Sequence, residues 1–228
     1  LNTMSVSKLL PRIIYIEGNI GSGKSTFCRL LDQLLKERNS NLKYTVLQEP
    51  VDDWMKIKDK QGVNLLERFY EDQKKYSFAF QMNSYISRAN KIVEARDNNE
   101  LDVIFVERSV FTDKLVFADN CYESGMMNDI EYEIYNTWHD TLVKYFNLIH
   151  YGYIYLKTDP KISHQRINKR LRQGEQGIPI EYLKSLDDRH NNWLSKETNV
   201  LNIDVSEDFT SEVTMNRFID SVIEKFSL

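Results

Sequence analysis

The sequence predicts an α/β fold in which a five-stranded parallel sheet lies between layers of helices. Two observations predict it. Short apolar segments alternate with long segments of helical spacing, and a glycine-rich loop joins the first apolar segment to the first helical one. The apolar segments are rich in β-branched and aromatic side chains, as buried parallel strands are. The expected strands cover residues 13–16, 44–47, 103–106, 153–156 and 200–203.

The segments between these strands carry the apolar periodicity of helices. The expected helices cover residues 25–38, 65–96, 130–146, 161–171, 181–193 and 213–226. No repeat and no Pro/Gly/Ser-rich linker divides the 228 residues, so a single domain over residues 1–228 is predicted. In a sheet of this kind ligands bind at the carboxyl ends of the strands. The residues that follow each strand are therefore the candidates for a site.

The composition is that of an ordinary globular protein, and it limits the partners. A net charge of -4 argues against a surface built to bind nucleic acid or an anionic membrane. The two cysteines, Cys28 and Cys121, indicate a reducing compartment rather than a disulfide framework. No apolar run is long enough to span a membrane, and residues 1–11 lack the character of a transit peptide. The cytoplasm is expected, or the mitochondrion if a transit peptide was removed.

The glycine-rich loop matches the phosphate-binding pattern G-x-x-x-x-G-K-[ST]. Its glycines allow the backbone to wrap a phosphate, and the start of the following helix adds positive charge. Lys24 is expected to reach the β/γ-phosphates, and Ser25 offers a hydroxyl to Mg²⁺. The expected phosphate-binding residues are Gly18, Asn19, Ile20, Gly21, Ser22, Gly23, Lys24, Ser25 and Thr26. The fold is therefore predicted to be the three-layer sandwich of P-loop NTPases.

The other strand ends carry charged residues that could define the reaction. Glu49 follows the second strand, where a carboxylate can accept the proton of an attacking hydroxyl. The third strand ends in Glu107, which could hold Mg²⁺ directly or through water. Arg108 comes next and could neutralise phosphate or orient Glu49. The alternative is that these are solvated surface groups.

The predicted helix over residues 65–96 carries polar residues on one face. Tyr70, Gln81, Ser84 and Arg88 are spaced by eleven, three and four residues, which keeps them close together around the helix axis. The amide of Gln81 suits the edge of a nucleobase because it both donates and accepts. Arg88 could pair with Asp113, which follows the third strand. The sequence thus predicts a polar surface that could read a base.

Three aromatic residues, Trp54, Phe80 and Phe117, could form the walls of a base pocket, although core packing is the simpler interpretation for each alone. A basic helix end with Arg166, Arg170 and Arg172 runs into a glycine-bearing loop. Such a segment suits an arginine-rich lid over a triphosphate, expected at about residues 166–178. The alternative is a solvated basic helix end.

Several motifs together resemble the deoxynucleoside kinases. They are Ile-Glu-Gly-Asn-Ile at 16–20, Glu-Pro-Val at 49–51 with Trp54 downstream, Tyr-Ser-Phe-Ala-Phe-Gln at 76–81, Glu-Arg-Ser at 107–109, Trp-His-Asp at 138–140 and Glu-Gln-Gly-Ile-Pro at 175–179. The resemblance extends from about residue 13 to 193. It implies transfer of the γ-phosphoryl group of ATP, with Mg²⁺, to a deoxynucleoside in nucleotide salvage. It also implies a homodimer formed through the helices at 65–96 and 130–146.

The resemblance also assigns roles to single residues. It makes Glu49 the general base at the 5′-hydroxyl with Arg108 beside it, Glu107 the carboxylate associated with Mg²⁺, and Tyr70 with Glu175 the pair at the sugar 3′-hydroxyl. The implied nucleoside-binding residues are Ile20, Glu49, Trp54, Tyr70, Phe80, Gln81, Ser84, Arg88, Arg108, Asp113, Phe117 and Glu175. Arg166, Arg170 and Arg172 are the implied lid arginines, and Lys24 completes the catalytic set with Glu49 and Arg108.

The same resemblance bears on the substrate. Family members that favour deoxycytidine or purine deoxynucleosides have the Arg–Asp pair found here as Arg88 and Asp113, whereas members that favour thymidine lack it. A thymine methyl group would face a desolvated charge at this place. Ser84 is similar to the residue of the deoxyguanosine kinases. Deoxyadenosine or deoxyguanosine is the predicted substrate, with deoxycytidine next. The chain departs from the family pattern at Gly174, where an acidic residue is common.

Two alternatives remain at the level of sequence. A nucleoside monophosphate kinase would need a basic cluster near Glu49 for the acceptor phosphate, but Asp52 and Asp53 follow instead. A regulatory nucleotide switch would leave the polar residues of the long helix without a role.

Overall fold

The computed structural model describes residues 10–38, 41–98, 100–170, 175 and 177–228. Its centre is a five-stranded, all-parallel sheet with the strand order β2-β3-β1-β4-β5. The strands are β1 (Arg12–Glu17), β2 (Tyr44–Leu47), β3 (Val103–Glu107), β4 (Gly152–Lys157) and β5 (Val200–Asp204). β1 lies in the middle of the sheet, where apolar side chains are covered on both faces.

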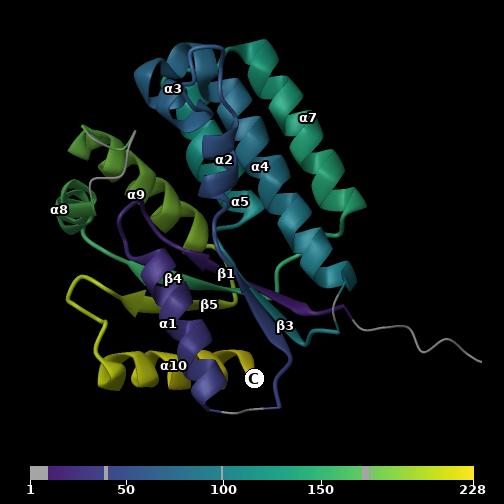
Figure 1. The fold of residues 1–228 in the computed structure, drawn as a ribbon, viewed down its shortest axis with the longest axis vertical. Coiled ribbons are helices and arrows are strands. Elements are labelled where there is room, and N and C mark those ends of the chain that lie inside the picture. Colours follow the sequence, from purple (N-terminus) through teal and green to yellow (C-terminus); the bar gives the residue numbers. More distant parts are fainter. Residues whose placement is uncertain (1–9, 39–40, 99, 171–174, 176) are drawn as a thin grey trace, which may run out of the picture.

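Helices cover both faces of the sheet and complete the three layers (Figure 1). On one face α1 (Lys24–Glu37) and α10 (Glu212–Phe226) bury an apolar core against the sheet. The larger core lies on the other face, beneath α4 (Gln73–Asn98), α7 (Asp129–Tyr145) and α9 (Ile180–Leu194). The fold predicted from the sequence is confirmed, and each strand and most helices begin and end within two residues of the prediction.

One predicted helix is wrong. The segment over 65–96 is two helices, α3 (Leu65–Glu71) and α4, separated at Asp72. Asp72 has φ -146° and ψ 79°, outside the helical region, and its carboxylate accepts a hydrogen bond from the backbone N–H of Lys75 at 3.2 Å. A short acidic side chain favours this capping arrangement over a helix interior. Tyr70 therefore lies on α3 and not on the helix that carries Gln81.

The remaining helical elements are short, and most of them border the carboxyl edge of the sheet. They are α2 (Val51–Lys56), α5 (Val110–Thr112), a π-helical turn η1 (Asp113–Ala118), α6 (Asp119–Glu123) and α8 (Pro160–Arg170). Except for α8, these elements were not predicted, because segments of three to six residues carry too little periodicity. Among the described residues, no helix is long and apolar enough to cross a membrane.

Candidate active site

The phosphate-binding loop joins β1 to α1 and is closely packed from both sides. Gly18 and Gly21 have φ values of 151° and 77°. A Cβ atom at Gly18 would come within 2.8 Å of the carbonyl oxygen of Leu156, and one at Gly21 within 2.5 Å of that of Ser163. Glycine is needed at both positions because no side chain fits between the loop and the backbone of β4 and α8.

Lys24 lies inside this loop rather than on the surface. Its Nζ donates to the carbonyl oxygens of Gly18 at 3.0 Å and Asn19 at 2.7 Å. Burial lowers the pKa of Lys24 to about 7, and the nearby charge of Arg108 acts in the same direction. An anionic ligand at the loop would therefore favour the protonated form of this amine.

The first turn of α1 is connected to the end of β3. The hydroxyl of Ser25 donates to Oε1 of Glu107 at 2.8 Å, and the backbone N–H of Glu49 approaches Oε2 of Glu107 at 3.3 Å. Three segments that are distant in sequence therefore meet at one carboxylate. The predicted metal-associated residues, Ser25 and Glu107, are in direct contact.

Glu49 lies between two arginines. Its Oε1 accepts from Nη2 of Arg88 at 3.0 Å and lies 3.2 Å from Nε of Arg108. Burial alone would raise the pKa of Glu49, but the charges of Arg108, Arg88 and Lys24 outweigh burial and lower it to about 2. The carboxylate is thus ionised across the physiological range and can accept a hydrogen bond or a proton.

Arg108 reaches this position through an unusual backbone conformation. Its φ is 63°, in the left-handed region that costs a non-glycine residue about 1–3 kcal/mol. Its backbone N–H donates to the carbonyl of Ile16 at 2.9 Å, and its Nη1 donates to the carbonyl of Gly18 at 3.0 Å. The guanidinium group also lies over the ring of Phe117, 4.9 Å from its centroid. The strained backbone aims the side chain toward the phosphate-binding loop.

The predicted pair of Arg88 and Asp113 is confirmed. Nε of Arg88 donates to Oδ2 of Asp113 at 2.9 Å, and the hydroxyl of Ser84 donates to Oδ1 at 3.1 Å. Arg88 also donates to the backbone carbonyl of Glu107 at 2.7 Å. Both partners are almost fully buried. One arginine therefore connects the wall of the pocket at Asp113 with Glu49.

Aromatic rings form the opposite end of the same pocket. Phe80 stacks on Phe69 with centroids 4.5 Å apart, and Trp54 meets Phe80 edge-on at 5.4 Å. The indole N–H of Trp54 donates to the hydroxyl of Ser87 at 2.8 Å, which fixes the ring. The amide of Gln81, one residue beyond Phe80, is buried and donates to the sulfur of Cys121 at 3.9 Å. This end is flat and apolar, with few polar groups.

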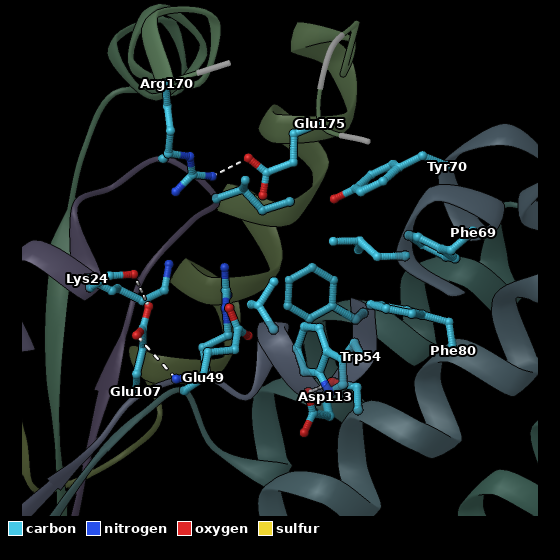
Figure 2. A pocket seen from close by; sticks show the side chains of 18 of the residues that line it. Lys24, Glu49, Trp54, Phe69, Tyr70, Phe80, Glu107, Asp113, Arg170 and Glu175 are labelled. Atoms are coloured by element: carbon cyan, nitrogen blue, oxygen red, sulfur yellow. Dashed lines mark hydrogen bonds and ion pairs between the residues drawn. The ribbon is translucent and has the colours of Figure 1, made fainter. Parts of the chain in front are cut away.

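Figure 2 shows how the two ends face each other across one cavity. Lys24, Glu49 and Glu107 lie at one side, and the rings of Tyr70, Phe69 and Phe80 at the other. Of the predicted nucleoside-binding residues, all but Arg88 line this cavity, and Arg88 lies directly behind Asp113. Sequence reasoning missed four lining residues, Val51, Leu66, Phe69 and Tyr182, because nothing in the sequence distinguishes them from core residues.

The predicted lid arginines have different surroundings. Arg170, at the end of α8, forms an ion pair with Glu175, and both line the cavity. Arg166 donates to the carbonyls of Ser22 at 3.3 Å and Val205 at 2.7 Å, so it ties α8 to the phosphate-binding loop and to the segment after β5. Arg172 and Gly174 lie outside the described residues.

A second hollow adjoins the phosphate-binding loop and shares four lining residues with the first cavity. It is lined by Gly21, Gly23, Thr26, Arg166, Arg170, Asp208, Phe209 and Thr210. The ring of Phe209 lies so close to Gly23 that a Cβ atom there would meet it at 2.9 Å. The loop thus borders two cavities.

The fold and the charged residues at its strand ends define a P-loop phosphotransferase. A family model described as deoxynucleoside kinase matches residues 14–227. The chain is 36% identical over 241 residues to the deoxycytidine kinase of Homo sapiens, covering 93% of this chain and 88% of that protein. Deoxycytidine kinase 2 of Gallus gallus is 35% identical over 244 residues, with 94% and 90% covered. The mitochondrial deoxyguanosine kinase of Xenopus laevis is 29% identical over 252 residues, with 99% and 93% covered.

The chain therefore belongs to the deoxynucleoside kinase family. It is a kinase whose substrates are a deoxynucleoside and a nucleotide that donates the phosphoryl group. The family assignment favours this activity over the alternatives of a nucleoside monophosphate kinase and a regulatory switch.

Proposed function

We propose that the enzyme phosphorylates deoxynucleosides whose base carries an exocyclic amino group, namely deoxycytidine, deoxyadenosine and deoxyguanosine. The observation that carries this proposal is the buried pair of Arg88 and Asp113 beside Gln81 and Ser84. A carboxylate in the pocket wall can accept a hydrogen bond from an amino group. A methyl group would remove water from the carboxylate without offering a hydrogen bond in its place. Relatives named as deoxycytidine and deoxyguanosine kinases support the same group of substrates.

The test is a steady-state assay with ATP and Mg²⁺ against the four natural deoxynucleosides. We expect kcat/KM for thymidine to be at least about 100-fold below that of the best substrate. A mismatched base would leave buried polar groups of the site without a hydrogen bond from the ligand, and such a site rejects it strongly. A leading value for thymidine would contradict the proposed base pocket but not the kinase activity.

We propose an in-line transfer to the 5′-hydroxyl without a covalent enzyme intermediate. Glu49 accepts the proton of that hydroxyl. Arg108 holds Glu49 in place and neutralises part of the negative charge that develops in the transition state. Lys24 contributes positive charge at the β/γ-phosphates. Tyr70 and Glu175, which line the cavity together, suit the sugar 3′-hydroxyl as hydrogen-bond partners.

The chemistry of the donor set fits a magnesium ion that arrives with the nucleotide. Mg²⁺ prefers oxygen ligands and is bound through one or two carboxylates together with substrate phosphates and water. Ser25 and Glu107 supply one hydroxyl and one carboxylate in contact. No group of three or more acidic, histidine or cysteine side chains suited to a metal exists within the described part of the chain. We propose that these two residues hold Mg²⁺, which would neutralise charge on the phosphates.

We further propose that ATP is the donor and that its adenine occupies the second hollow. The hollow lies beside the phosphate-binding loop, and Phe209, which does not line the aromatic cavity, offers a ring for stacking. The predicted lid over residues 166–178 would then contribute Arg170 between the two cavities. Replacement of Phe209 by alanine should raise KM for ATP and leave KM for the deoxynucleoside unchanged; equal KM values for ATP would contradict this placement.

We propose a homodimer formed through α7. Three apolar side chains spaced by four residues are exposed on this helix: Ile130 by 73%, Ile134 by 42% and Trp138 by 50%. A stripe of this kind on a surface helix is typical of an interface. The variant Trp138→Glu should convert a dimer into a monomer in light scattering after gel filtration. A monomeric parent protein would contradict the proposal.

We also propose that residues 1–228 form a single domain, because one continuous sheet draws its strands from residues 12 to 204. We propose a cytoplasmic location, because Cys28 and Cys121 are free and buried, as is usual in a reducing compartment.

A further inference from the structure

Glu17 is a buried carboxylate that the proposed mechanism does not use. It is the last residue of β1, it is fully buried, and it does not line either cavity. Its Oε2 accepts a hydrogen bond from the hydroxyl of Thr112 in α5. A carboxylate in such a place is unfavourable unless polar partners hold it, so the contact with Thr112 is a built feature of the interior.

The contact continues to Ser109. The hydroxyls of Thr112 and Ser109 are 3.2 Å apart, and the backbone N–H of Thr112 donates to Oγ of Ser109 at 3.0 Å. Either hydroxyl can be the donor in this contact, and Ser109 also hydrogen-bonds to Glu17 directly. Ser109 is also the N-cap of α5. The end of β1 is thus tied through two hydroxyls to the turn that follows β3.

Arg108 is the residue immediately before Ser109. Its φ of 63° persists only where the flanking backbone is fixed on both sides. On one side the N–H of Arg108 bonds to Ile16 in β1. On the other side the fixed residue is Ser109, held by Thr112 and through it by Glu17. Both anchors start from β1, the strand that leads into the phosphate-binding loop.

We propose that Glu17 and Thr112 are positioning residues for Arg108. They fix Ser109 and thereby hold the left-handed backbone that directs the guanidinium group of Arg108 to Glu49 and to the carbonyl of Gly18. Neither residue lines the two cavities. This inference rests on the proposed catalytic role of Arg108, and the experiment below separates the two.

The first pair of variants is Thr112→Val and Thr112→Ser. Valine keeps the shape but removes the hydroxyl, whereas serine keeps the hydroxyl. We expect Thr112→Val to lower kcat at least about tenfold with KM for the deoxynucleoside within about threefold, because a small displacement of a catalytic group affects the transition state most. Thr112→Ser should stay within about threefold of the parent in kcat. An unchanged kcat in Thr112→Val would overturn the proposal.

The second step repeats Thr112→Val in an Arg108→Ala background. If Thr112 acts through Arg108, its replacement should change kcat less than about twofold once Arg108 is gone. A loss as large as in the parent would mean a merely structural role and would also overturn the proposal. If Arg108→Ala alone keeps the parent kcat, the catalytic role assigned to Arg108 fails instead.

Folding is checked with two further variants. Glu17→Met keeps the approximate size of the side chain but removes both oxygens that could accept from Thr112, and it should reproduce the loss of kcat even if Thr112→Val proves too unstable to purify. Thr158→Val removes another buried hydroxyl, one without a hydrogen-bond partner among the described residues, and should leave kcat within about twofold. Thermal unfolding of all variants shows whether kcat falls independently of stability. A normal kcat in a folded Glu17→Met would contradict the positioning role of Glu17.

Discussion

The two ends of the main cavity are built in different ways (Figure 2). At the phosphate end, Lys24, Glu49 and Glu107 follow or end three different strands, and ion pairs with arginines hold the carboxylate of Glu49. At the aromatic end, Phe69 and Phe80 come from two helices and pack on each other within the larger apolar core. The rigid sheet thus carries the charges that the reaction needs, while the helices carry the surface that meets the base.

This difference separates the two tasks of the enzyme. Changes at the charged end should act on kcat, since those groups are aimed at the reacting atoms. Changes at the aromatic end should act on KM and on the choice of base. The predictions below test that division, beginning with the largest expected effect.

Glu49→Gln should give the largest loss. The amide keeps the shape but cannot take the proton of the 5′-hydroxyl, so kcat should fall about 10²–10⁴-fold while the dissociation constant of the deoxynucleoside changes little. Single-turnover assays and equilibrium titration measure the two quantities. The control is Asp52→Asn, which neutralises an exposed carboxylate three residues away. Equal turnover in Glu49→Gln and Asp52→Asn would exclude Glu49 as the base.

Arg88 and Asp113 should control the base together. In the double variant Arg88→Met/Asp113→Ala, the ratio of kcat/KM for thymidine to that for deoxycytidine should rise about 100-fold, because the buried charges that oppose a methyl group are gone. Arg88→Met alone should be less stable than the double variant by about 3 kcal/mol, since it leaves the buried carboxylate of Asp113 without its ion-pair partner. The same order of substrates in parent and double variant would refute this assignment.

Phe80→Leu should have a smaller and different effect. It removes one ring of the stack with Phe69 and should raise KM for the deoxynucleoside about tenfold, with kcat nearly unchanged. Phe78→Leu, on the same helix but outside the cavity lining, serves as the control. If Phe80→Leu lowered kcat instead, the separation between the two ends of the cavity would not hold.

The smallest effect concerns the protonation of Lys24. Its pKa of about 7 in the free protein should rise when phosphate binds, so binding above pH 7 takes up a proton and affinity falls as the pH increases. Between pH 7 and 8 the dissociation constant of ATP should rise about fivefold. Calorimetry at pH 8 in buffers of different ionisation enthalpy measures the uptake. In Lys24→Arg the uptake should vanish, and its persistence there would assign the proton to another group.

The sheet and the charged end of the site could be predicted because both leave local signals. Strand positions follow from short β-branched runs, and Glu49, Glu107 and Arg108 stand where those runs end. The pairing of Arg88 with Asp113 could be predicted because Arg88 belongs to a polar helix face and Asp113 follows the third strand, which brings opposite charges to the same edge of the sheet.

The rest depends on tertiary contacts that the sequence does not display. Phe69 and Tyr182 line the cavity, yet they look like any apolar core residue. The break at Asp72 is hidden because apolar residues continue on both sides of it. The left-handed backbone of Arg108 is held by the hydrogen bond from its N–H to Ile16 of β1, a residue far away in the sequence. Such long-range contacts leave no periodicity to detect.

The strand order has a consequence for how the protein forms during synthesis. β1 precedes the other strands of this sheet in the sequence, but its two neighbours are β3 and β4, which begin at residues 103 and 152. β1 therefore gains its first neighbour only after residue 107 has been made and its second only after residue 157, and its apolar side chains are exposed to aggregation and to chaperones in the meantime. The phosphate-binding loop is thus translated before β3 and β4 and is enclosed only after them.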